Sequence, residues 1–259
     1  MLSHIPNPAI IAHRGASAYA PENTLAAFEL AVRQKADAIE LDAKLTIDGH
    51  VVVFHDQTLD RTTGAQGRVI DSKLADLRRL DAGSHFDVAY RGEPIPTLDE
   101  VFDLAGKLIF INVELTNYAS LLDRLPEKVA EIVNKHNLAE RVMFSSFNPI
   151  ALIRIRRILP EVPIGLLARP GRKGAWARSW IGTLIRYQSL NPVLDDVDKR
   201  LVARTHRRGC SLLVHTVNQP EDMRRLFQLG VDGIITDDPL TARRILSAVS
   251  AQRMRDRQR

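Results

Sequence analysis

Glu40 and Asp42 are two carboxylates separated by one residue within the largely apolar segment 38–42. Residues two apart on a β-strand point to the same face. Two carboxylates on one face repel each other unless a cation or a proton lies between them. Glu114, after the apolar run 108–113, would complete an oxygen-rich site for one hard divalent cation, Ca²⁺ or Mg²⁺. The alternative is that the three acids form separate surface ion pairs.

Two histidines follow other apolar runs, His13 after 10–12 and His55 after 51–54. Imidazole titrates near neutral pH, so a pair of histidines beside an acidic cluster is typical of a general acid and a general base. One such histidine alone would usually be structural, but two histidines and three acids at strand ends favour catalysis. Arg14 has a planar guanidinium that matches two phosphate oxygens. A salt bridge to a neighbouring acid is the competing interpretation for Arg14.

Alternating apolar and amphipathic segments must position these side chains. We expect strands at 10–12, 38–42, 51–54, 108–113, 142–144, 164–167, 212–214 and 233–235. We expect helices at 24–34, 98–105, 121–136, 149–159, 198–208, 219–229 and 239–249. This pattern indicates βα units and a parallel sheet covered by helices. Seven or eight units favour a closed (β/α)8 TIM barrel, with its active site where the strands end. A doubly wound sheet is the alternative, but no Gly-x-Gly-x-x-Gly follows the first strand.

The segment 57–96 interrupts the βα rhythm and is longer than an ordinary βα loop. We interpret it as a small insertion after the second strand that caps one mouth of the barrel. No Ser/Gly-rich linker divides the rest. The expected organisation is one barrel domain over 1–249 and a basic, flexible tail over 250–259.

The charge balance argues against a nucleic-acid partner. The 259 residues include 36 Lys and Arg against 31 Asp and Glu, a net charge of +5. Four Arg and one Asp in 253–259 contribute +3, which leaves +2 for the rest. Cys210 is the one cysteine, which excludes an internal disulfide and a Cys-rich zinc site. No signal-peptide pattern and no apolar run of about 20 residues is present, so we expect a cytoplasmic protein.

Both tryptophans lie in the segment 169–187, which is also rich in Arg. Trp176, Trp180 and Leu184 recur at helical spacing. The pattern predicts a barrel helix with its apolar face on the sheet. The alternative is an interfacial or lid helix that makes peripheral membrane contact, under which lysophospholipids become plausible substrates.

Several short motifs together resemble the glycerophosphodiester phosphodiesterase family of the phospholipase-C-like superfamily. They occur in collinear order between residues 10 and 239. They are Ala12-His13-Arg14-Gly15, Pro21-Glu22-Asn23-Thr24, Glu40-Leu41-Asp42, Val53-Phe54-His55-Asp56, Leu59-Asp60-Arg61-Thr62-Thr63, Pro96-Thr97-Leu98, Asn112-Val113-Glu114, Ser145-Ser146-Phe147, Thr216-Val217-Asn218, Gly230-Val231-Asp232-Gly233 and Thr236-Asp237-Asp238-Pro239.

The resemblance implies a barrel enzyme that hydrolyses small-molecule glycerophosphodiesters to sn-glycerol 3-phosphate and an alcohol. It implies that Glu40, Asp42 and Glu114 bind the metal and that Arg14 contacts the phosphate. His13 and His55 would be the acid/base pair, with neither assigned to one part. A lysophospholipase D type of activity and a non-catalytic phospholipid- or sugar-phosphate-binding barrel are the alternatives.

Two positions depart from the pattern that the resemblance implies. Many relatives carry Lys two residues after the third metal ligand, where this chain has Thr116. A neutral hydroxyl cannot supply the positive charge of an ammonium group to a phosphate. The usual Trp before Thr-Val-Asn is His215, which we expect at the same mouth as a further substrate contact or as a pocket wall.

Overall fold

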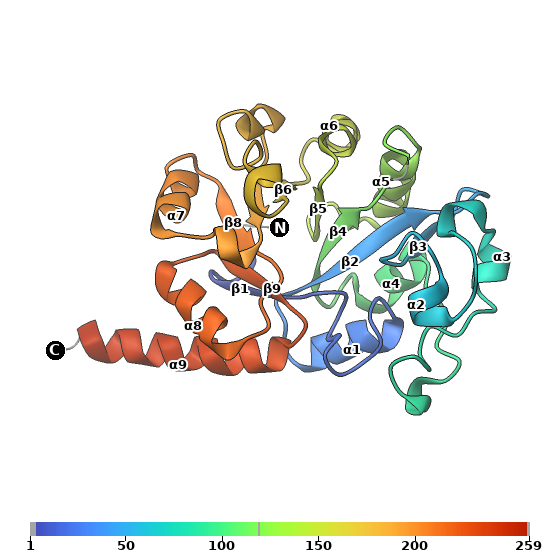
Figure 1. Cartoon of the computed structure of the whole chain (residues 1–259), viewed down its shortest axis with the longest axis horizontal. Helices are drawn as coiled ribbons and strands as arrows, with labels where there is room; N and C mark the ends of the chain where they lie inside the picture. The colour runs from blue at the N-terminus through green and yellow to red at the C-terminus, as the bar shows by residue number, and fades with distance from the viewer. Residues whose placement is uncertain (1–3, 119, 258–259) are drawn as a thin grey trace.

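The computed structural model describes residues 4–118 and 120–257, which form a closed parallel barrel surrounded by helices (Figure 1). Eight strands make the barrel in the order β1, β9, β8, β7, β6, β5, β4 and β2, and pairing of β1 with β2 closes it. Their bounds are β1 (Ala9–Ala12), β2 (Ala38–Leu45), β4 (Phe110–Leu115), β5 (Val142–Ser146), β6 (Ile164–Ala168), β7 (Ser189–Pro192), β8 (Ser211–Val214) and β9 (Gly233–Thr236). The predicted TIM barrel is confirmed.

Amphipathic helices cover the outside of the barrel. They are α1 (Leu25–Arg33), α4 (Leu98–Ala105), α5 (Leu125–His136), α6 (Pro149–Ile158), α7 (Lys199–His206), α8 (Pro220–Leu229) and α9 (Pro239–Arg257). Side-chain caps fix several helix starts. Thr97 forms a capping box with Glu100 at the start of α4, and Thr24 caps α1. The last helix continues to Arg257, beyond the expected end at residue 249.

A short extra strand, β3 (Val51–Val53), pairs antiparallel with the end of β2 outside the barrel. The segment 57–96 follows it and holds the helices α2 (Asp60–Thr63) and α3 (Leu74–Leu77) and two 3₁₀ turns, Val69–Asp71 and Val88–Tyr90. This segment has an apolar cluster separate from the barrel core. The cluster contains Val52, Phe54, Leu59, Val69, Leu77, Ala82 and Ile95. The extra strand thus anchors the segment 57–96 beside β2 (Figure 1).

The helix expected within 169–187 does not form, and this prediction is wrong. The segment instead has two 3₁₀ turns, Gly171–Gly174 and Gly182–Ile185. A Cβ at Gly174 would lie 1.8 Å from the carbonyl oxygen of Arg169, so the chain is tightly folded there. Trp176 packs against the core, whereas Trp180 and Leu184 are each 67% exposed. No helix in the described ranges has both the length and the apolar character needed to cross a bilayer.

Candidate active site

The three predicted ligand carboxylates meet at the carboxyl ends of β2 and β4. The parallel register places Asp42 opposite Glu114, and Glu40 lies two residues earlier on the same face of β2. One oxygen from each acid lies within 4.8 Å of the others. Glu40 and Asp42 are buried and Glu114 is half-buried. The sequence prediction that these acids cluster is therefore matched by their placement.

The electrostatics of this cluster favour a bound cation. Burial, and then the charges of Asp42 and Glu114, raise the pKa of Glu40 well above its usual value. Burial and the charge of Asp42 raise the pKa of Glu114 to about 8. Glu40 Oε1 is also buried without a hydrogen-bond partner. Buried like charges are stable only when a proton or a cation lies among them, so the three oxygen donors fit a hard divalent ion.

Each of the three acids accepts, on one carboxylate oxygen, a hydrogen bond from a neighbouring group. The backbone N–H of Arg14 donates to Glu40 Oε2 at 3.0 Å. Asn23 Nδ2 donates to Asp42 Oδ2 at 2.8 Å, and Tyr118 Oη donates to Glu114 Oε1 at 2.6 Å. The second oxygen of each carboxylate is then available to a cation. Such outer hydrogen bonds orient metal ligands.

The backbone of the His-Arg-Gly motif explains how Arg14 reaches Glu40. Arg14 has φ 54° and Gly15 has φ 85°, so two consecutive residues are left-handed. A Cβ at Gly15 would lie 2.7 Å from the carbonyl carbon of Ala27 in α1, so only glycine fits this close approach. The turn thereby directs the N–H of Arg14 into the acidic cluster.

The guanidinium of Arg14 is part of an ion-pair network. Its Nη1 donates to Glu22 Oε1 at 2.8 Å, and its Nε lies 3.4 Å from Asp42 Oδ2. Burial alone would lower the pKa of Arg14, but the charges of Asp42, Glu22 and Glu40 outweigh it and raise that pKa. Arg14 thus forms the salt bridges of the competing interpretation, one of them with the predicted metal ligand Asp42.

Each predicted catalytic histidine has an aspartate on its Nδ1. His13 Nδ1 lies 2.6 Å from Asp237 Oδ1, and His55 Nδ1 lies 2.6 Å from Asp56 Oδ1. Asn218 and Ser17 hold Asp237 in turn, at 2.6 Å and 3.1 Å. A carboxylate on Nδ1 fixes the tautomer and the ring orientation and leaves Nε2 for proton transfer.

Arg61, in the segment 57–96, connects His55 to the acidic cluster. Its guanidinium pairs with Asp56 and donates two hydrogen bonds to Glu22, of 2.6 Å and 2.8 Å. Glu22 also binds Arg14. Burial would raise the pKa of Glu22, but these two arginines lower it to about 2. A continuous chain of ion pairs therefore runs from His55 to the predicted metal ligands.

His215 lies at the same mouth, half-buried against Phe147, with their ring centroids 6.0 Å apart and nearly perpendicular. Burial, followed by the charge of His13, lowers the pKa of His215 to about 4. Its Nδ1 is buried without a hydrogen-bond partner. The neutral imidazole of His215 therefore lines the barrel mouth near His13, and its Nδ1 has no hydrogen-bond partner.

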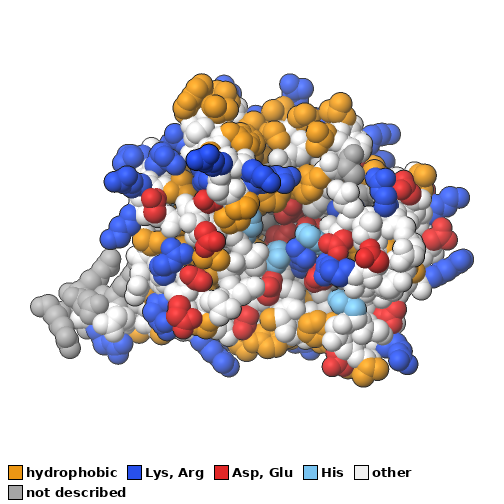
Figure 2. Space-filling model, in the orientation of Figure 1, with side chains coloured by type: hydrophobic (Ala, Val, Ile, Leu, Met, Phe, Trp, Pro, Cys, Tyr) orange, Lys and Arg blue, Asp and Glu red, His pale blue; other side chains and the backbone are white. Residues whose placement is uncertain are grey.

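Figure 2 shows acidic and histidine side chains together around a hollow near the middle of one face. The sequence prediction placed the ligands and histidines but missed the residues that orient them. These are Glu22, Asn23, Asp56, Arg61, Tyr118 and Asp237. All but Tyr118 lie in the family motifs, which was an available signal. The distances between partners in the sequence range from one residue for His55 and Asp56 to 224 residues for His13 and Asp237.

Comparisons with known proteins agree with this geometry. Residues 13–241 match the model of the glycerophosphoryl diester phosphodiesterase family. A glycerophosphodiester phosphodiesterase of Caldanaerobacter subterraneus subsp. tengcongensis is 43% identical, over 90% of this chain and 95% of that protein. A human lysophospholipase D, GDPD1, is 27% identical over 93% of this chain and 87% of that protein.

A solved structure gives the same result for the fold. The phosphodiesterase of Oleispira antarctica, in complex with the product sn-glycerol 3-phosphate, superposes with a TM-score of 0.85 at 31% identity. The alignment covers 95% of this chain and 98% of the Oleispira chain. The chain described here belongs to the glycerophosphoryl diester phosphodiesterase family and is a phosphoric diester hydrolase.

Proposed function

We propose that this enzyme hydrolyses glycerophosphodiesters to sn-glycerol 3-phosphate and an alcohol, with a divalent cation and two histidines. The observation that carries the proposal is the placement of two aspartate-bound imidazoles and three clustered carboxylates at one barrel mouth. The product bound to the Oleispira relative supports the choice of glycerol 3-phosphate.

In this proposal Glu40, Asp42 and Glu114 hold the cation, Ca²⁺ or Mg²⁺. When bound, the ion supplies Lewis-acid stabilisation of negative charge on the substrate. The three carboxylates fix its place, and their hydrogen bonds to Asn23 and Tyr118 keep them oriented.

Proton transfer is assigned to the histidines. One imidazole removes the proton from the attacking oxygen, which belongs to water or to the glycerol 2-hydroxyl. Attack by the 2-hydroxyl gives a cyclic phosphate, which water then opens to glycerol 3-phosphate. The other imidazole protonates the leaving alkoxide. Asp237 and Asp56 stabilise the imidazolium that forms in either case. Arg14 stabilises charge that develops on the phosphoryl oxygens, and His215 forms a wall of the substrate pocket.

The test is release of glycerol 3-phosphate from glycerophosphocholine, with Ca²⁺, with Mg²⁺ and after exhaustive chelation. We expect release with at least one cation and loss of at least about 100-fold after chelation, with recovery on adding the ion back. Asp42→Asn should remove activity under all three conditions. Full activity after chelation, with no bound metal by elemental analysis, would rule out the metal-dependent proposal.

A second candidate substrate class is lysophospholipids. Trp180, Ile181 and Leu184 are exposed on the β6–β7 connection. Arg169, in the same connection, lies over the ring of Phe147 with 5.5 Å between its Cζ and the ring centroid. Exposed apolar side chains in a connection that also carries basic residues fit an acyl chain or an anionic membrane. The human lysophospholipase D relative adds to this reading.

Paired assays on glycerophosphocholine and lysophosphatidylcholine separate the two substrate classes. If lysophospholipids are substrates, a double variant with Trp180→Ser and Leu184→Ser should lose activity on the lysolipid alone. Vesicles containing an anionic phospholipid should then co-sediment with the wild type and not with the variant. No hydrolysis of the lysolipid and no vesicle binding would eliminate both the substrate class and peripheral membrane contact through 169–187.

A further inference from the structure

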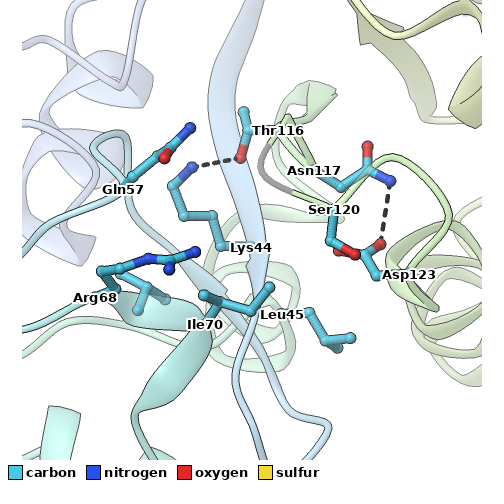
Figure 3. Close-up of a pocket in the computed structure, with 10 residues that line it drawn as sticks. Lys44, Leu45, Gln57, Arg68, Ile70, Thr116, Asn117, Ser120 and Asp123 are labelled. Carbon is cyan, nitrogen blue, oxygen red and sulfur yellow. Dashed lines mark hydrogen bonds between the residues drawn. The ribbon is translucent and has the colours of Figure 1, made fainter.

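Lys44 continues the functional face of β2 toward the barrel mouth. It lies two residues after Asp42, as Thr116 lies two residues after Glu114 on β4. The register pairs Asp42 with Glu114 and places Lys44 beside Thr116 one step beyond. The Nζ of Lys44 donates to Thr116 Oγ1 at 3.0 Å (Figure 3). The ammonium group is therefore built next to the candidate metal ligands.

The surroundings of this ammonium group do not provide hydrogen-bond acceptors for all of its N–H donors. Lys44 is 8% exposed, and a buried ammonium has three hydrogens that require acceptors. Within the described residues, Thr116 is its one hydrogen-bond partner and no carboxylate lies within ion-pair distance. The hydroxyl of Thr116 is itself bound to the carbonyl oxygen of Ala43. Two N–H donors therefore remain for a group outside the protein.

The charges around Lys44 indicate that the missing hydrogen-bond partner is an anion. Asp42, Glu114 and Asp56 are the acids whose charges act on Lys44. A divalent cation bound by Asp42 and Glu114 would neutralise much of their charge. Asp56 is already paired with Arg61. With the cation bound, the protein leaves Lys44 without a dedicated counter-ion. An anion at the mouth would supply it.

Access to Lys44 is provided by a pocket between two loops. Gln57 and Arg68 line it from the segment after β3, and Asn117 and Ser120 line it from the β4–α5 connection. Figure 3 shows Gln57 and Arg68 reaching toward Lys44 from one side. Arg68 is a second cation in this wall and adds to the attraction for an anion. The acid among the lining residues is Asp123, whose Oδ1 accepts hydrogen bonds from Asn117 and from the backbone N–H of Leu125.

We propose that Lys44 contacts the phosphoryl oxygens of the substrate and of the glycerol 3-phosphate product. It supplies from β2 the positive charge that Thr116 cannot supply from the neighbouring position just after β4. The inference rests on the proposed function. It adds a substrate-binding residue that the motif pattern does not mark, since Lys44 lies outside the Glu-x-Asp motif.

The test compares Lys44→Met with Lys107→Met, a matched control. Lys107 is exposed in the loop before β4, at the opposite end of the barrel. Lys44→Met should lower kcat/KM for glycerophosphocholine about 10- to 100-fold, because a charge-assisted hydrogen bond is lost. It should weaken binding of sn-glycerol 3-phosphate to the cation-loaded enzyme about 10-fold and leave Ca²⁺ or Mg²⁺ affinity within about twofold. Lys107→Met should change none of these quantities.

A charge-relocation variant, Lys44→Thr with Thr116→Lys, tests the same claim while keeping one lysine side chain at this place in the site. It should bind product at least about fivefold more tightly than Lys44→Thr alone, and this comparison decides the matter if Lys44→Met does not fold. Product affinity unchanged in Lys44→Met, or a loss of metal affinity equal to the loss of product affinity with no rescue by relocation, would overturn the proposal. A wild type that binds product but hydrolyses no glycerophosphodiester would instead refute the proposed function.

Discussion

Each predicted catalytic or metal-binding residue is oriented by a small number of pairwise contacts, some within a few residues in the sequence and some between residues far apart. His13 is oriented by Asp237, His55 by Asp56, and Glu114 by Tyr118. A functional side chain that lacks its partner retains its chemistry but loses its orientation and tautomer. The contribution of these partners can therefore be measured by substitutions that keep size and remove only charge.

Asp237→Asn tests the orientation of His13. We expect kcat for glycerophosphodiester hydrolysis to fall about 10- to 100-fold with little change in KM, because proton transfer is impaired while substrate contacts remain. The neighbouring Asp238→Asn is the control, since Asp238 binds Tyr19 and caps α9 at Thr241. Steady-state kinetics on both variants give the answer, and an equal effect on both would contradict the assignment.

Glu22→Gln tests the ion-pair network through stability. The pKa of Glu22 is about 2 in the folded protein, below its ordinary value of 4.5. The ionised carboxylate therefore stabilises the fold above about pH 4.5, and this contribution is lost as the pH falls toward 2. The variant should be less stable than the wild type by about 2 kcal/mol at pH 7. Urea unfolding from pH 7 to pH 3.5 should show this gap shrinking, and a gap that stays constant with pH would contradict the account.

At the scale of elements, the sequence predicts the strands that contain an apolar run and the helices whose apolar residues recur at helical spacing. Strand β7 was missed because its residues, Ser189-Leu190-Asn191-Pro192, lack an apolar run. Its two polar side chains instead bind each other inside the barrel, at 2.8 Å between Ser189 Oγ and Asn191 Oδ1. The helix expected over 169–187 fails because Gly174 and Gly182 pack against backbone where a side chain would clash. The first outcome depends on the closed barrel around β7, and the second on tight backbone contacts within 169–187 that an apolar period does not reveal.

The segment 57–96 is expected to open independently of the barrel, because its apolar cluster is separate. Leu77 is 1% exposed in that cluster, so Leu77→Ala should destabilise the segment by about 2 to 5 kcal/mol. Amide hydrogen exchange should speed up across 57–96 and stay slow in β4 to β9. The control Leu108→Ala removes a side chain that is 67% exposed and should change neither region. Faster exchange throughout the barrel in Leu77→Ala would show that the segment is not a separate unit.

For the whole molecule, the motif residues predicted from the sequence converge because the barrel brings the ends of distant strands to one mouth. The sequence could predict which residue types meet there but not their hydrogen-bond partners. Arg61 illustrates the difference, since it acts through Glu22, 39 residues away. Lys44 is a second example, because only the strand register places it beside Thr116.

Cation binding should stabilise the whole molecule. At about 100 times the dissociation constant, a ligand adds about 2.7 kcal/mol, which raises Tm by about 5 to 10 °C for a domain of this size. Glu114→Gln should lose most of this shift. The same variant should melt higher than the wild type after chelation at pH 8. Burial and the charge of Asp42 raise the pKa of Glu114 to about 8, so this carboxyl lowers stability above its ordinary pKa of 4.5, and a neutral glutamine does not. Calorimetry with and without chelator measures both effects, and a metal-free Glu114→Gln that melts lower would contradict the electrostatic argument.

The central claim is that His13 and His55 perform the proton transfers of glycerophosphodiester hydrolysis in this barrel. The most direct measurement is the rate of glycerol 3-phosphate release from glycerophosphocholine by His13→Ala, His55→Ala and the wild type, with Ca²⁺ or Mg²⁺ present. We predict that the wild type is active and that each variant is at least about 100-fold slower while keeping its circular dichroism spectrum and Tm. Wild-type rates in both folded variants would contradict the claim.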